Sequence, residues 1–169
     1  MPALTDKNSP PGMLIGLKLG WLSGRDLIDW AVESLADDKP FSASGQILEI
    51  GSLNPNKPES PERAVRLISD YMAAHHPGFD EDSPEAEPLV YGWTIRALRD
   101  HLNGPRPAED LLNLVGVVEQ VLDYPDWCRE LWEACDDAVF MDETKDWARL
   151  QGIASNILIK LEAGKLPRT

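Results

Sequence analysis

Histidine side chains, the usual general bases and metal ligands, are few in this chain and poorly spaced for chemistry. His75 and His76 are adjacent, so on a helix their side chains point about 100° apart. They therefore lack the i, i+4 spacing with which two histidines bind one metal ion. His75 continues an apolar stripe and His101 precedes a predicted helix end, so we interpret both as structural residues near helix C-termini. The sequence predicts no metal site.

The two cysteines, Cys128 and Cys135, lie seven residues apart. On a helix this separation is a rise of about 10.5 Å, whereas a disulfide needs Cα atoms within about 7 Å of each other. We therefore expect the two residues to stay reduced. Their shared helical face predicts core thiols in a reducing cytoplasm, and not metal ligands or nucleophiles.

Carboxylates are abundant, but no motif beside them indicates catalysis. The chain contains no nucleophile-elbow serine, no metalloprotease histidine pair and no phosphate-binding loop. A general acid–base pair needs an environment that separates two pKa values, and no sequence pattern marks one here. We therefore expect a protein that is not an enzyme, with no catalytic residues and no cofactor.

The distribution of charge is more informative than the number of acids. The 169-residue chain has a net charge of −13 and a pI of about 4.5, which opposes direct nucleic-acid or anionic-membrane binding and favours a basic protein partner. Residues 80–87 contain five acids and no base, and residues 126–146 contain eight acids and two bases. A charge run is often only a solvated surface. Two such runs in a small chain nevertheless predict a surface for a basic partner.

Tight binding would also need apolar anchors, which the six tryptophans could supply. Trp132 and Trp147 fit predicted core stripes. Trp127 lies about 100° from the Cys128 stripe, so it is either a partly exposed contact residue or a side chain packed between helices. The candidate partner-binding residues are therefore Asp80, Glu81, Asp82, Glu85, Glu87, Trp127, Asp136, Asp137, Asp142 and Glu143.

These candidate residues are predicted to lie on or between helices that proline and glycine separate. The apolar periodicity predicts helices over about 24–36, 61–75, 85–102, 108–124, 125–139 and 143–163. Segment 46–53 fits either a short helix or a short strand, and no hairpin signal occurs. We expect an all-α fold: a single domain of about six or seven helices, as an irregular bundle or stacked helical hairpins, with residues 1–11 as a flexible lead-in.

The N-terminal segment places glycine at every fourth position, at Gly12, Gly16, Gly20 and Gly24. The apolar run 13–22 includes Lys18 and is far shorter than the roughly 20 residues that span a membrane. The flanking residues also lack the features of a secretion signal. Because each glycine weakens a helix by up to about 1 kcal/mol, we expect residues 12–22 to be irregular or extended. A helix then begins at Ser23, which forms a capping-box pattern with Asp26.

The segment WLSGRDLIDWAVESL, followed by QILEIGSLNP, resembles one group of small helical bacterial immunity proteins. These accompany the toxins of contact-dependent inhibition and related polymorphic toxin systems. In that group a tryptophan, a basic residue followed by aspartate, and an apolar helix precede an I-L-E-L-like helix. The resemblance covers about the first third of the chain and favours a helix for segment 46–53. The matching positions are Trp21, Arg25, Asp26, Leu27, Ile28, Trp30, Ala31, Ile47, Leu48, Glu49 and Ile50.

The resemblance implies a binding function without catalysis. A protein of this group is cytoplasmic, binds its cognate toxin domain in a heterodimer and blocks it. Many such toxins are nucleases with basic clefts that an acidic inhibitor can cover. The resemblance also implies that Trp21, Arg25 and Asp26 support the fold, so the predicted contacts depend on the acidic segments. The alternative function is a regulatory or adaptor module that binds another basic protein.

Overall fold

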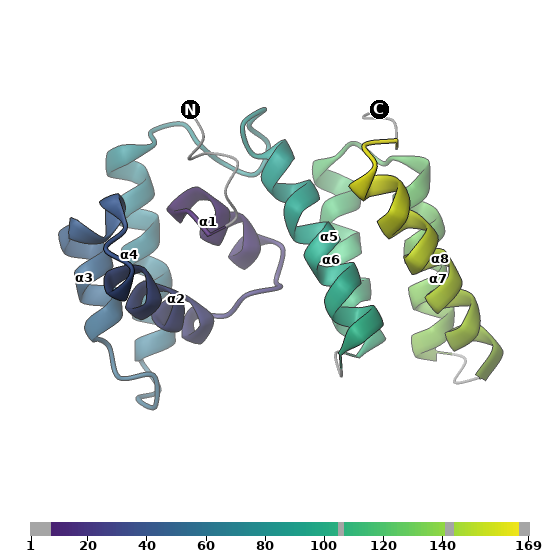
Figure 1. Cartoon of the computed structure of the whole chain (residues 1–169), viewed down its shortest axis with the longest axis horizontal. Coiled ribbons are helices and arrows are strands. Elements are labelled where there is room, and N and C mark those ends of the chain that lie inside the picture. Colours follow the sequence, from purple (N-terminus) through teal and green to yellow (C-terminus); the bar gives the residue numbers. More distant parts are fainter. Residues whose placement is uncertain (1–7, 105–106, 141–143, 166–169) are drawn as a thin grey trace. The chain divides into compact units, whose positions relative to one another are not determined.

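The computed structural model describes residues 8–104, 107–140 and 144–165, and these ranges contain eight α-helices, one short 3-10 helix and no strand (Figure 1). The predicted all-α class is confirmed, and the number of helices is slightly higher than predicted. The elements are α1 (Pro10–Lys18), α2 (Gly24–Ala36), η2 (Pro40–Ala43), α3 (Gly45–Ser52), α4 (Ser60–His75), α5 (Glu87–Asn103), α6 (Ala108–Val121), α7 (Asp126–Phe140) and α8 (Thr144–Glu162).

The helices group into two compact units, Met1–Leu89 and Val90–Thr169. In the first unit, α2, α3 and α4 pack against one another, and α1 packs against α4. In the second unit, α6 packs against α7, and α7 packs against α8. The part of α5 in this unit contacts α7 through the Tyr91 and Trp127 rings, and it contacts α8 through the Arg99–Glu162 ion pair.

The additional helix is α1, so the prediction of an irregular segment over residues 12–22 is wrong for residues 12–18, whereas residues 19–22 lie outside any helix, as predicted. The Ser9 hydroxyl accepts a hydrogen bond from the Gly12 N–H at 3.2 Å, and two prolines begin the helix, where a missing N–H costs little. Met13 and Ile15 are 3% and 0% exposed. Burying one such side chain contributes about 2 kcal/mol, more than the roughly 1 kcal/mol that a glycine costs the helix.

The start of α1 also corrects the predicted flexible lead-in. Pro10 and Pro11 are buried in the first unit, and the carbonyl oxygen of Asn8 accepts a hydrogen bond from Trp30 Nε1 at 2.7 Å. Residues 8–11 therefore belong to the folded unit. The rest of the predicted lead-in, residues 1–7, lies outside the described residues.

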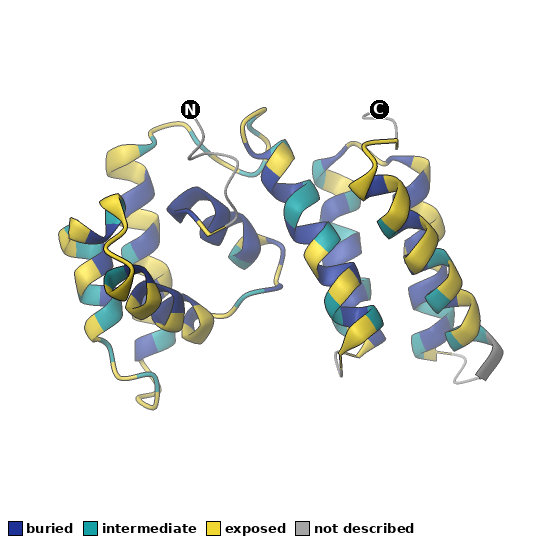
Figure 2. Cartoon of the chain, viewed as in Figure 1, coloured by how far each residue is buried: buried dark blue, intermediate teal, exposed yellow. Residues whose placement is uncertain are grey.

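Most of the other predicted elements are present. The capping box of α2 forms as predicted, because the Asp26 carboxylate accepts the Ser23 N–H at 2.7 Å and the Ser23 hydroxyl accepts the Asp26 N–H. Residues 46–52 of segment 46–53 are helical in α3, and Ile47 and Ile50 are fully buried. Helix α4 begins one residue earlier than predicted, at the buried Ser60. Helices α2 to α8 each have a buried face and a more exposed face (Figure 2), whereas residues 10–16 of α1 are all buried.

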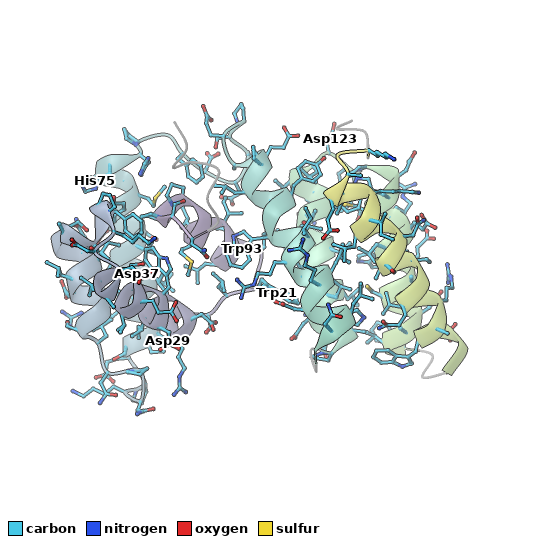
Figure 3. The ribbon with its side chains drawn as sticks, in the orientation of Figure 1. Trp21, Asp29, Asp37, His75, Trp93 and Asp123 are labelled. Atoms are coloured by element: carbon cyan, nitrogen blue, oxygen red, sulfur yellow. The ribbon has the colours of Figure 1, made fainter. Side chains whose placement is uncertain are left out.

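Four helices end in the same way, with a residue in the left-handed conformation: Gly20 after α1, Asp38 after α2, Asp123 after α6 (Figure 3) and Gly164 after α8. Each end has the two backbone hydrogen bonds of a Schellman motif. After α2, for example, the Asp38 N–H donates to the Leu35 carbonyl and the Lys39 N–H donates to the Ser34 carbonyl. Glycine adopts this conformation without strain, whereas aspartate does not.

We expect Asp38→Gly to raise the free energy of unfolding by about 0.5 kcal/mol, because it removes the left-handed strain at the cost of a more flexible unfolded chain. The reverse change, Gly164→Asp, should lower it by a similar amount. Urea denaturation followed by circular dichroism measures both. A lower stability for Asp38→Gly would show that the aspartate side chain stabilises this end of α2.

Candidate partner-binding surfaces

The residues that resemble immunity proteins mainly support the first unit. Trp21 is 3% exposed and Asp26 caps α2. Arg25 is exposed, and its Nη2 donates to Asn56 Oδ1 at 3.2 Å in the turn that precedes α4. The Trp30 ring is buried and stacks on Phe41 with the ring centroids 5.4 Å apart. Trp21 and Trp30 are therefore core residues of the first unit, and Asp26 caps a helix within it.

The first acidic segment, residues 80–87, connects α4 to the first residue of α5. Asp80 and Asp82 are exposed, and the Asp80 carboxylate accepts the Asp82 N–H at 3.1 Å. Glu81 forms an ion pair with Lys18 of α1, with Nζ and Oε1 3.5 Å apart. Part of this acidic segment is therefore involved in contacts within the first unit.

The remaining predicted residues of this segment have different surroundings. Glu87 begins α5 and is only partly exposed. Glu85 is exposed and lines an open hollow of about 190 Å³ with His76, Pro77, Gly78 and Phe79. The hollow is open to solvent, and among the described residues its only charged or titratable lining groups are one carboxylate and one imidazole, which does not define a binding site for a small ligand.

All three histidines have structural contacts. The His75 ring stacks on Tyr71 with centroids 4.2 Å apart, and its Nδ1 lies 2.9 Å from the Tyr71 carbonyl oxygen. Burial lowers the pKa of His76, and the neighbouring His75 adds to this shift. His101 is buried, and its Nε2 lies 3.2 Å from Gln151 Nε2. Within the described ranges, no group of three or more His, Cys, Asp or Glu side chains is placed to hold a metal ion.

The second acidic segment forms most of the outward side of α7. Asp126, Glu130 and Glu133 are exposed, and with Asp137 they follow one another at intervals of four, three and four residues, so they lie along one side of the helix. Asp136 is partly exposed. Asp137 forms an ion pair with Arg149 of α8. The predicted residues Asp142 and Glu143 lie outside the described residues.

Trp127 is not an exposed contact residue, so that prediction is wrong. Its side chain is 5% exposed, and its ring centroid lies 6.3 Å from that of Tyr91 on α5. It belongs to the buried face of α7, together with Leu131 and Ala134. The alternative, that Trp127 packs between helices, is the correct one. Its Nε1 is buried and has no hydrogen-bond partner in the described part of the chain.

The aromatic side chains that α7 exposes are Trp132, which is 37% exposed, and Phe140, which is 73% exposed. The prediction of Trp132 as a core residue is therefore wrong. Its indole lies beside Gly116 of α6, where an added Cβ would be 3.8 Å from Nε1. The candidate residues predicted from the sequence do not include the exposed Phe140, Glu130 and Glu133. Together with Asp136 they follow one another at intervals of three or four residues, a spacing that would have predicted that they share the outward side of the same helix.

No family model, no curated protein and no solved structure matches the chain. The resemblance to immunity proteins therefore stays an expectation. None of the helices in the described ranges has both the length and the apolar character needed to cross a membrane.

Proposed function

We propose that this protein is a cytoplasmic immunity protein that binds a cognate toxin domain and neutralises it. The observation that supports this function best is the row of exposed carboxylates on α7, a rigid element on which a basic surface could dock. The N-terminal resemblance points to the same class of protein. The partner in this proposal is a basic domain, and a nuclease fits best because its active site must attract phosphates.

The proposed mechanism is occlusion of the toxin's active site. Carboxylates of the immunity protein lie where the phosphates of the nucleic acid would otherwise bind, so substrate and inhibitor compete for the same cations. The protein carries out no reaction. The tightness of the complex then depends on buried anchor residues, while the charges mainly speed association and select the partner.

A growth experiment tests the proposed function. The polypeptide encoded directly upstream of this chain in its genome is expressed in a bacterial host, alone and together with this protein. We expect growth to stop in the first case and to recover in the second. If the upstream polypeptide does not affect growth, the immunity function loses its main consequence. Binding of that polypeptide without toxicity would instead favour a regulatory or adaptor module.

Association with the toxin domain should depend strongly on salt. Between about 0.05 M and about 0.5 M NaCl, we expect the association rate constant to fall tenfold or more, because salt screens exposed charges. The dissociation rate constant should change much less. Stopped-flow fluorescence measures both constants. Charge reversal at the segment that faces the toxin, either Asp136 and Asp137 or residues 80–82, should slow association and flatten its salt dependence. Equal salt dependence in all variants would exclude electrostatic steering by these residues.

A further inference from the structure

The outward side of α7 combines charge with exposed aromatic surface. Asp126, Glu130 and Glu133 form one row along the helix, and Trp132, Asp136 and Phe140 form the adjacent row at intervals of four residues. We call these six residues the α7 face. Since successive residues of an α-helix are 100° apart, the two rows lie side by side on the same half of the helix.

The carboxylates of the α7 face are available to a partner. Among the described residues, none forms an ion pair with Glu130 or Glu133. Asp137, just outside the face, is neutralised by Arg149 of α8, and Glu81 of the other acidic segment is paired with Lys18. The two acidic segments therefore differ, because the α7 face keeps unpaired carboxylates next to exposed aromatic rings.

The aromatic side chains of the α7 face supply the apolar area that tight binding requires and that charged side chains do not provide. Trp132 and Phe140 expose large apolar area to water, and burial of such area against a partner is favourable. Tryptophan and phenylalanine are enriched in the cores of protein–protein interfaces, where they occupy pockets from which water is excluded. Residues 80–87 contain no aromatic side chain.

We propose that the α7 face, and not residues 80–87, is the docking surface for the toxin domain, so this inference rests on the proposed function. The partner surface would carry lysine or arginine side chains around an apolar hollow that receives Phe140 and the exposed edge of Trp132. Charge complementarity favours a basic partner over a second copy of this chain. The α7 face has four carboxylates, with Arg129 as the adjacent base, and would repel another α7 face.

Matched variants of the full chain test the proposal by calorimetric titration with the upstream polypeptide. Glu130→Gln/Glu133→Gln removes two charges from the α7 face, and its control, Asp80→Asn/Asp82→Asn, removes two charges from exposed sites of the other segment. Trp132→Ala and Phe140→Ala remove the anchors, and their control is Ile159→Ala on α8, a residue 63% exposed. We expect each α7 variant to weaken binding about tenfold or more and each control less than threefold.

The outcomes separate this inference from the proposed function. Wild-type affinity in the α7 variants, with weaker binding in the residue 80–82 control, would overturn the docking surface and leave the immunity function intact. If the upstream polypeptide does not bind, the proposed function fails, and a second probe decides the surface. This probe is a synthetic helical peptide with lysines on one side and leucines on the other, followed by amide chemical-shift changes. Changes confined to α7 and lost in Trp132→Ala support the surface, whereas changes spread over all acidic segments overturn it.

Discussion

Replacing Gly24 with alanine should lower the free energy of unfolding of the first unit by about 3 kcal/mol. Gly24 is the buried first residue of α2. A Cβ atom at this position would lie 2.1 Å from the carbonyl oxygen of Pro61 and 2.6 Å from its carbonyl carbon. Pro61 is in the first turn of α4 and its backbone has no alternative rotamer, so α2 and α4 would have to move apart. Close-packed interiors resist such a shift.

Gly45 provides the matched control for this prediction. It is the first residue of α3 and follows an N-cap serine, as Gly24 does, but an added Cβ would have no atom within 4 Å. We expect Gly45→Ala to leave stability unchanged or to raise it by up to about 1 kcal/mol, because alanine restricts the unfolded chain. Urea denaturation of both variants makes the comparison. Equal effects would show that the approach of Pro61 does not determine the need for glycine at position 24.

The second unit should lose stability steeply at alkaline pH because of its two buried thiols. Cys128 and Cys135 are free and fully buried. Burial raises the pKa of Cys135 to about 12. Burial also raises the pKa of Cys128, and Glu119 adds to that shift. An unfolded thiol has a pKa of about 8.5, so it loses its proton long before the folded one.

The sign of this dependence follows from the raised pKa values. Below about pH 8.5 the thiols are protonated in both the folded and the unfolded chain, and the second unit keeps its full stability. As the pH rises towards the folded pKa, the free energy of unfolding falls by about 1.4 kcal/mol per pH unit for each thiol. Between about pH 8 and pH 10, the two thiols together should lower the free energy of unfolding by about 4 kcal/mol. Guanidinium denaturation at both pH values measures this loss.

The variant Cys128→Ala/Cys135→Ala is the control for the alkaline effect. It lacks both thiols, so its free energy of unfolding should fall much less between the two pH values, even if its stability at neutral pH is lower. A thiol reagent such as Ellman's reagent gives an independent measurement, because only the thiolate reacts. Native protein should react only at the rate of unfolding. Immediate reaction of two thiols at neutral pH would contradict the burial of these residues.

The helices of the second unit show how much local sequence determines. The apolar spacing in α6, α7 and α8 predicted their positions to within a few residues. The spacing of Cys128 and Cys135 predicted two buried, reduced thiols, and the structure confirms both. Such patterns act within one or two helical turns, so they can be evaluated without knowing what the helix packs against.

The tryptophans of α7 show why the candidate surface could not be fully predicted. Relative to the mean direction of Cys128, Leu131 and Cys135, Trp127 and Trp132 lie about 70° to either side of the buried stripe. The periodicity of α7 therefore predicts the same degree of burial for the two residues. The neighbouring helices distinguish them, because Trp127 faces Tyr91 of α5 while Trp132 lies at the margin beside Gly116 of α6.

Local patterns in the sequence were enough to predict the all-helical class, most helix positions, the capping of α2, the reduced state of the cysteines and the location of the acidic segments. Only the tertiary structure showed that α1 is a helix, that Gly24 touches the backbone of Pro61, and that Asp137 is paired while no described residue pairs with Glu130. The physical reason is the range of the interactions. Helix propensity, capping and periodicity depend on neighbours in the chain, whereas burial and ion pairing depend on residues that folding brings together from distant positions.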